Sequence, residues 1–205
     1  MSPERRPAAA ADKIALRSEI SLLRRAGAGF ERRLAAVRPD QLMRPSPCDE
    51  WTVRDLVTHV VGECIMSVRL LDGASAEDTM AGLDDRILGD DAAAAFAQAA
   101  RAENASFEQP HVTERIVHHP AMDMPAAQLL GFRIGGLTLH TWDLARATGG
   151  DETLDPDLVE AVWAQLSPMA PFIAQTGVFG AGPSGDVGQD RSLQLRLLDL
   201  SGRRP

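Results

Sequence analysis

Apolar residues recur mostly every three or four positions along this chain, a spacing that predicts helices rather than strands. The first predicted helix covers residues 12–37 and ends at a proline-rich segment, because proline lacks the amide donor that a helix needs. The second covers residues 53–71. Its start is well marked, since Thr52 can cap it and Asp55 can bond back to the cap residue.

Helices are also predicted in the second half of the chain. An alanine-rich helix capped by Asp90 or Asp91 runs to about Phe107. The next begins at Pro125 and continues to Gly149, with apolar residues on nearly every side. We therefore expect this helix at the centre of the protein.

Two more helices are predicted toward the end of the sequence. One starts at Pro156, with Asp155 as its cap, and ends before Pro171. The other lies within residues 189–200. We expect the glycine-rich segment 177–188 to be a loop, and no predicted strand precedes it as a dinucleotide-binding loop would require.

Residues 112–119 alternate apolar and polar side chains only imperfectly. We predict an extended segment there that is too short and too isolated to form a sheet. Taken together, the patterns predict an all-α protein.

Composition and charge narrow the classes of function. The chain has 205 residues without a break in composition, so we expect one domain over residues 1–205, with residues 1–11 as a flexible start. The formal charge of −8 disfavours nucleic acid and anionic membranes as partners. The sequence has neither an apolar run long enough to span a bilayer nor the pattern of a signal peptide, which predicts a cytoplasmic protein. Cys48 and Cys64 are expected to be free thiols.

The histidines are the first candidates for chemistry. His59 lies in the middle of the second predicted helix, His140 in the middle of the central helix, and His118 and His119 stand together before a proline. Imidazoles on facing helices are one way in which helical bundles build an internal metal site. A histidine on an apolar face is, however, more often a buried, hydrogen-bonded side chain, and the sequence leaves both interpretations open.

Other polar residues of the central helix extend this candidate site. Arg133 lies two turns before His140 on the same face, which favours either an anionic ligand or an ion pair with a carboxylate such as Asp123. Asp143 can pair with Arg146 or orient His140.

Two adjacent glycines interrupt the same helix. Gly135 and Gly136 should weaken it, so we expect either a close helix crossing or a bound ligand at this point.

Two segments of the sequence resemble a known family. These segments, residues 47–62 and 139–149, read PCDEWTVRDLVTHVVG and LHTWDLARATG. They resemble the signature helices of the DinB-like superfamily, in particular the short actinobacterial members of the mycothiol-dependent maleylpyruvate isomerase group. The resemblance extends in order over about residues 12–203. It implies a DinB-like four-helix bundle with additional C-terminal helices and a pocket between the second and the central helix.

The resemblance also implies a set of site residues. In this family a divalent metal, usually zinc, is held by two histidines, which correspond to His59 and His140, and by a carboxylate one helical turn before the second. Glycine stands at that third position here, so His118, His119, Glu63 or Asp143 would have to replace the missing ligand. The family's thiol cofactor is mycothiol.

Three functions remain open at the level of sequence. The first is a metal-dependent mycothiol transferase or isomerase that acts on a small electrophilic molecule, with His59, His140 and Arg133 as catalytic residues. The second is a metal-free bundle whose cavity binds or rearranges a small organic substrate by acid-base chemistry. The third is a non-catalytic bundle that forms dimers, and a homodimer is compatible with all three.

Overall fold

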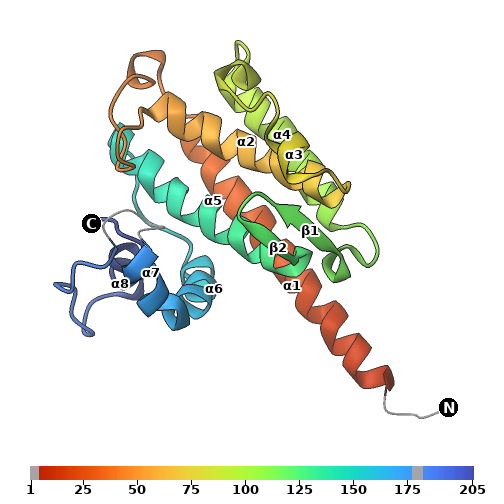
Figure 1. Cartoon of the computed structure of the whole chain (residues 1–205). Coiled ribbons are helices and arrows are strands. Elements are labelled where there is room, and N and C mark those ends of the chain that lie inside the picture. The colour runs from red at the N-terminus through yellow and green to blue at the C-terminus, as the bar shows by residue number, and fades with distance from the viewer. Residues whose placement is uncertain (1–4, 177–181) are drawn as a thin grey trace.

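Four long helices pack side by side at the centre of the computed structural model (Figure 1). They are α1 (Arg5–Leu34), α2 (Val53–Leu71), α4 (Ala92–Phe107) and α5 (Ala126–Thr148). Helices α1 and α2 each contact both α4 and α5, so the four enclose one core. The prediction of an all-α, DinB-like four-helix bundle is confirmed.

Shorter elements surround this bundle within the described residues, 5–176 and 182–205. They are η1 (Pro39–Gln41), α3 (Ala76–Met80), η2 (Asp85–Leu88), η3 (Val112–Glu114), α6 (Pro156–Leu166), η4 (Ser167–Met169), α7 (Ala170–Thr176) and α8 (Leu193–Leu200). Helix α6 contacts both α5 and α8, so the C-terminal helices extend the bundle on the side of α5. The first part of the predicted glycine-rich loop, residues 177–181, lies outside the described residues.

The start of α2 is fixed by reciprocal hydrogen bonds. The Thr52 hydroxyl accepts from the Asp55 amide at 3.2 Å, and the Asp55 carboxylate accepts from the Thr52 amide at 2.9 Å. Thr52 also pairs through its backbone with Pro45 in an isolated antiparallel bridge. These contacts fix the loop before α2 at the point where the helix begins.

A small β-hairpin precedes α5. Residues 116–119 are extended as predicted, but the prediction that this segment forms no sheet was wrong. Strand β1 (Ile116–His119) pairs antiparallel with β2 (Met122–Pro125), and Val117 lies opposite Met124. Both of these side chains are buried, so the hairpin has one apolar face against the core. The prediction failed because it contained no second strand: it assigned Pro125 to the helix, whereas Pro125 pairs with Ile116 of β1.

Several helix boundaries also differ from the predictions. Helix α1 begins at Arg5 and ends at Leu34, where residues 12–37 were predicted. Helix α6 ends at Leu166, and Pro171 lies in the first turn of α7 instead of ending a helix. Proline is tolerated there because the first amides of a helix have no intrahelical acceptor.

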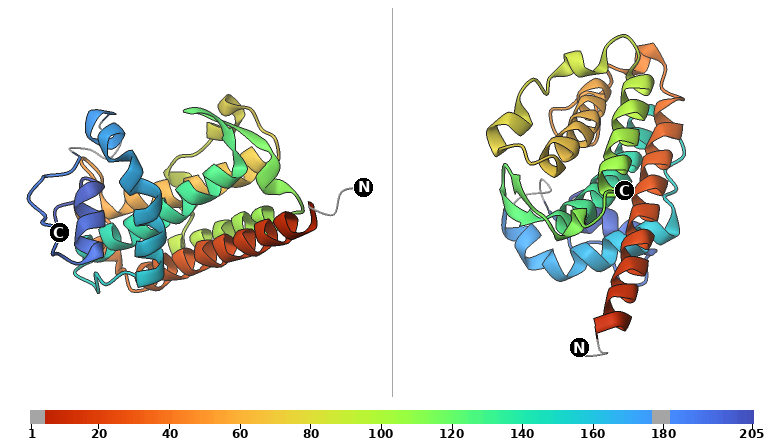
Figure 2. Two further views of the ribbon diagram at one scale, coloured as in Figure 1. Left: turned by 90° about the horizontal axis from the view of Figure 1, so that it is seen from below. Right: turned by 90° about the vertical axis from the view of Figure 1, so that its right-hand side faces the viewer.

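The hairpin and α7 project on the same side of α5, as the left view in Figure 2 shows. One face of α5 therefore lines a cavity that lies between the hairpin and α7. None of the described helices has the length and apolar character that a membrane span needs.

Removal of the α2 cap should destabilise the protein measurably. Thr52→Ala eliminates the side-chain acceptor for the Asp55 amide, and we expect a loss of about 1 kcal/mol in the free energy of unfolding, measured by urea denaturation. Ser18→Ala, at an exposed position of α1, is the control and should cause no loss. Equal losses in both variants would contradict a capping role for Thr52.

Candidate active site

A cavity of about 1340 Å³ follows α5 along most of its length. Its wall includes residues of α5 from Leu129 to Ala147, and residues of α2, the hairpin and α6. The cavity is closed further by the loop before α2 and by residues 201–204. Helix α2 runs antiparallel to α5 here, since His59 lies beside His140, and Glu63, one turn later on α2, contacts Arg133, two turns earlier on α5.

Two imidazoles and an indole meet in the middle of this cavity. The ring centroids of His59 and His140 are 5.1 Å apart in an edge-on arrangement. The Trp51 ring lies 4.7 Å from that of His59 and 6.3 Å from that of His140. The structure therefore brings together the two histidines that the sequence singled out.

His140 is oriented by a buried carboxylate. Its Nδ1 lies 2.9 Å from Asp143 Oδ2, and because a carboxylate only accepts, Nδ1 carries the hydrogen and Nε2 is the basic nitrogen. Arg203 donates to both oxygens of Asp143, at 3.1 and 2.6 Å. Burial alone would raise the pKa of Asp143, but the hydrogen bond from His140 and the charge of Arg203 lower it to about 2.

His59 stands at the end of a second polar chain. Its Nε2 lies 3.5 Å from Glu63 Oε1, and the other oxygen of Glu63 accepts from Arg133 Nη1. Arg133 Nε donates to Glu103 Oε1 at 2.6 Å, and the side chains of Arg133 and Glu103 are only 2% and 1% exposed. Burial, together with the nearby His140 and Arg133, lowers the pKa of His59 to about 4 despite the opposing effect of Glu63, so this ring is neutral at pH 7.

The other two histidines lie in the hairpin and differ in position. His119 lines the cavity, and its Nδ1 accepts from the amide of Ala121 at 3.1 Å. His118 lies outside the cavity lining, with its side chain 57% exposed and its Nδ1 2.9 Å from Asp123. Asp123 thus contacts His118, whereas the sequence had offered it as the partner of Arg133.

Gly135 and Gly136 each lie where a side chain would meet a neighbour, but the neighbours differ. A Cβ atom on Gly135 would lie 3.7 Å from Val162 of α6, which indicates a close helix crossing. A Cβ atom on Gly136 would lie 3.3 Å from Glu63 Oε2 and 3.7 Å from Arg133 Nη1. The second glycine therefore leaves room for the Glu63–Arg133 ion pair.

Sequence reasoning missed two charged partners in this network, Glu103 and Arg203. Glu103 had a usable signal, because it occupies a position of the apolar stripe formed by Phe96, Ala99 and Phe107 on α4. A lone carboxylate on a buried stripe indicates an internal cation. Arg203 carried no such signal, since it lies 60 positions from Asp143.

Comparison with known proteins identifies the family. Residues 23–145 match the family described as mycothiol maleylpyruvate isomerase N-terminal domain. Uncharacterized proteins from two strains of Mycobacterium tuberculosis are each 36% identical to this chain over 148 residues, covering 72% of this chain and 77% of theirs. The chain belongs to the mycothiol-dependent maleylpyruvate isomerase family.

Solved structures agree on the fold. A crystal structure of the mycothiol-dependent maleylpyruvate isomerase superimposes with a TM-score of 0.62 at 19% identity, covering 82% of this chain and 73% of that one. A histidine-to-alanine mutant of that isomerase superimposes with a TM-score of 0.60 at 18% identity and the same coverage.

Among the described residues, no carboxylate without an arginine partner stands beside both His59 and His140 to serve as a third metal ligand. Position 136, where the family resemblance implies a carboxylate, has no side chain to donate. Each neighbouring carboxylate is already paired with an arginine, Glu63 with Arg133 and Asp143 with Arg203. A divalent ion would therefore have to compete with a buried guanidinium for either carboxylate.

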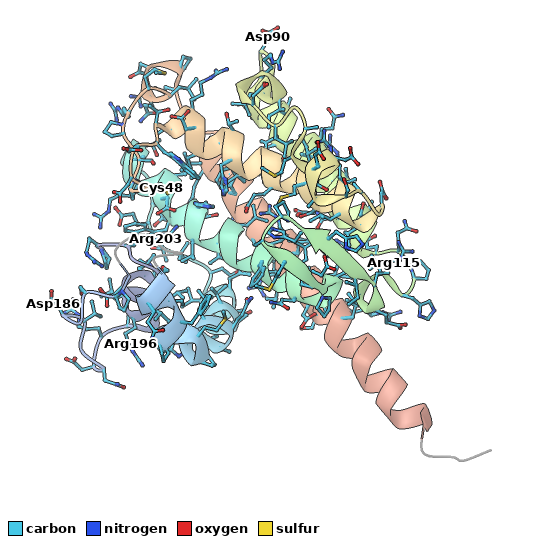
Figure 3. The ribbon with its side chains drawn as sticks, in the orientation of Figure 1. Cys48, Asp90, Arg115, Asp186, Arg196 and Arg203 are labelled. Atoms are coloured by element: carbon cyan, nitrogen blue, oxygen red, sulfur yellow. The ribbon has the colours of Figure 1, made fainter. Side chains whose placement is uncertain are left out.

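Another possible ligand group involves Cys48. Potential ligand atoms of Cys48, His140 and Asp143 all lie within 4.8 Å of one another, and Figure 3 labels Cys48 close to Arg203. Burial and the charge of Asp143 raise the pKa of the Cys48 thiol to about 12, so the sulfur is protonated and lies 3.5 Å from Asp143 Oδ2 as a donor. Metal binding here would have to remove that proton and displace Arg203, so this group fits a metal no better.

The buried ion pair between Glu103 and Arg133 should be essential for stability. Glu103→Ala leaves the Arg133 guanidinium without its buried partner on α4, and we expect a loss of about 3–5 kcal/mol in unfolding free energy, measured by urea denaturation. Asp40→Ala breaks an exposed ion pair with Arg38 and should leave stability nearly unchanged. A small loss of unfolding free energy for Glu103→Ala would contradict the proposed contribution of this ion pair to stability.

Restoring a carboxylate at position 136 should improve zinc binding. We expect weak binding of Zn²⁺ to the wild-type protein and an affinity at least about tenfold higher for Gly136→Glu, measured by isothermal titration calorimetry. Gly136→Gln has nearly the same size but no charge, and should gain much less. Tight, stoichiometric binding by the wild type that disappears in His59→Ala would show that the site accepts a metal as it stands.

Proposed function

We propose that this chain is a mycothiol-dependent isomerase or transferase that acts on a small electrophilic molecule. Two observations support the proposal: the chain belongs to the mycothiol-dependent maleylpyruvate isomerase family, and His140 presents an oriented base to a large cavity. The second observation carries the proposal, because a thiol becomes a strong nucleophile only when it loses its proton.

The cavity is larger than a pocket for one ligand usually is. Pockets for one drug-sized ligand usually measure about 300–1,000 Å³, and this one has about 1340 Å³. Four arginines line it near the C-terminal end of α5: Arg44, Arg146, Arg203 and Arg204. Arg203 is bonded to Asp143 and Ser201, so the other three are the ones that can donate to a polar cofactor. Mycothiol, when bound, would supply a sulfur nucleophile that forms a bond to an electrophilic carbon and, in an isomerase, breaks it again.

His140 moves the proton in this proposal. Its Nε2 accepts the thiol proton, while Asp143 stabilises the resulting imidazolium through Nδ1. The same proton returns when the sulfur leaves, or goes to the product when the sulfur stays. Arg203 keeps Asp143 ionised throughout and acts as a positioning residue.

His59 and Arg133 have supporting roles. His59 remains neutral beside Trp51, and the two rings cover one side of His140, where they limit the access of water to it. The Arg133 guanidinium is bonded to both Glu63 and Glu103, so we assign it the role of fixing Glu63 beside His59. Neither role requires a metal, and the hydrogen bonds that occupy Glu63 and Asp143 favour proton transfer by the side chains without a metal.

Turnover with mycothiol tests this function. Purified protein should convert maleylpyruvate, or a related α,β-unsaturated carbonyl compound, in a mycothiol-dependent reaction followed by the change in absorbance. His140→Ala should lower kcat/KM by about 10²–10⁴-fold, since it removes the general base. His111→Ala, an exposed histidine outside the cavity, is the matched control and should keep full activity.

The outcomes separate the three functions. Full activity of His140→Ala would overturn the role of His140. Conversion at the same rate without any thiol would favour a thiol-independent rearrangement in the cavity. Absence of turnover with every thiol and electrophile tested would favour a non-catalytic bundle.

A further inference from the structure

The cavity has two ends with opposite character. Toward the C-terminal end of α5 its walls carry the four arginines described above. Toward the N-terminal end they carry large apolar side chains from four different elements, here called the methionine end: Met66, Met122, Met124, Leu129, Phe132 and Met169. His59 and His140 lie between the two ends.

Methionine is strongly concentrated at this end. Four of the chain's seven methionines line the cavity, and α2, the hairpin and η4 all contribute. Methionine side chains are flexible and polarisable, so a wall built from them adapts to apolar groups of different shape. Such a concentration is typical of surfaces that bind apolar groups with little demand on their exact form.

The methionine end is long, and its charged side chains among the described lining residues are Glu63 and Arg133, which are paired with each other. On α5, Leu129 precedes His140 by 11 positions, which corresponds to about 16 Å along the helix axis. His119 and Gln165 are its polar lining groups. A small dianion would gain no binding energy from this part of the cavity. An apolar chain would be removed from water over its whole length and would bind more tightly for that reason.

The rim of the methionine end is also apolar. Met122 of the hairpin and Phe172 of α7 both line the cavity, and they are 57% and 51% exposed. They project from the two elements that stand on the same side of α5 in Figure 2. This rim would let an apolar group enter from solvent without passing the arginines.

We propose that the methionine end binds an apolar alkyl or aryl group of the electrophile. The inference deepens the proposed function: the substrate class becomes an α,β-unsaturated carbonyl compound with an apolar tail, whose reactive carbons lie beside His140. The tail occupies the cavity toward Leu129, and the thiol cofactor occupies the arginine end.

Binding of uncharged alcohols tests the apolar end without any chemistry. We expect 1-octanol to bind at least about tenfold more tightly than 1-butanol in isothermal titration calorimetry, because each added methylene leaves water. Met122→Asp introduces a charge at the rim and should weaken octanol binding about tenfold or more. Equal affinities for the two alcohols would overturn the proposal.

Met80→Asp is the matched control. Met80 is 51% exposed, close to the exposure of Met122, but does not line the cavity. Its variant should bind octanol as the wild type does. A similar loss in both variants would mean that octanol adsorbs elsewhere on the surface, and would overturn the assignment to the methionine end.

Turnover of unsaturated aldehydes distinguishes this inference from the proposed function. With mycothiol present, trans-2-nonenal should have a kcat/KM at least about tenfold higher than trans-2-butenal. Equal thiol-dependent turnover of both aldehydes would leave the proposed function standing and overturn the inference. Preferential octanol binding without turnover of either aldehyde would support the apolar end and count against the thiol chemistry.

Discussion

The buried guanidinium of Arg133 is the interaction on which the arrangement of this site depends. It comes from α5 and bonds to Glu63 of α2 and Glu103 of α4, so one side chain joins three of the four bundle helices. A charge at 2% exposure is tolerable only when it is fully paired, which requires both carboxylates to keep their positions. The same pairing orients Glu63 beside His59 and thereby sets one wall of the cavity.

His59 and His140 have similar surroundings. Each lies next to a carboxylate, and each carboxylate is held by an arginine from a distant part of the chain. Arginines thus occupy the acceptors that a metal would need, and Gly136 makes space for one of these pairs. In the site that the family resemblance implies, a metal ion would balance the charge of the carboxylates. Here the guanidinium groups of Arg133 and Arg203 balance the charge of Glu63 and Asp143.

The sequence predicted the long helices well, because apolar spacing and capping residues act locally. The reciprocal bonds of Thr52 and Asp55 are an example, since both residues lie within one helical turn. The hairpin was missed because strand pairing joins two segments that are individually too short to be recognised.

The site was predictable only in part. The positions of His59 and His140 on two helices suggested that their side chains meet. In the structure their ring centroids are 5.1 Å apart. The contact between His140 and Asp143 was among the predicted alternatives, but the carboxylates that pair with Arg133 and the arginine that pairs with Asp143 were not found, because an ion pair leaves no periodic signal in the sequence. Glu103 alone broke a pattern, as a carboxylate on the apolar stripe of α4.

The contact between Arg203 and Asp143 has a consequence for how the molecule is made. All four bundle helices are complete by Thr148, but the cation that Asp143 needs comes 60 residues after it in the chain. While a ribosome synthesises the protein, the bundle can therefore assemble before Asp143 is neutralised. The ion pair that holds Asp143 beside His140 would then form as one of the last steps of maturation, after the helices around it have already packed.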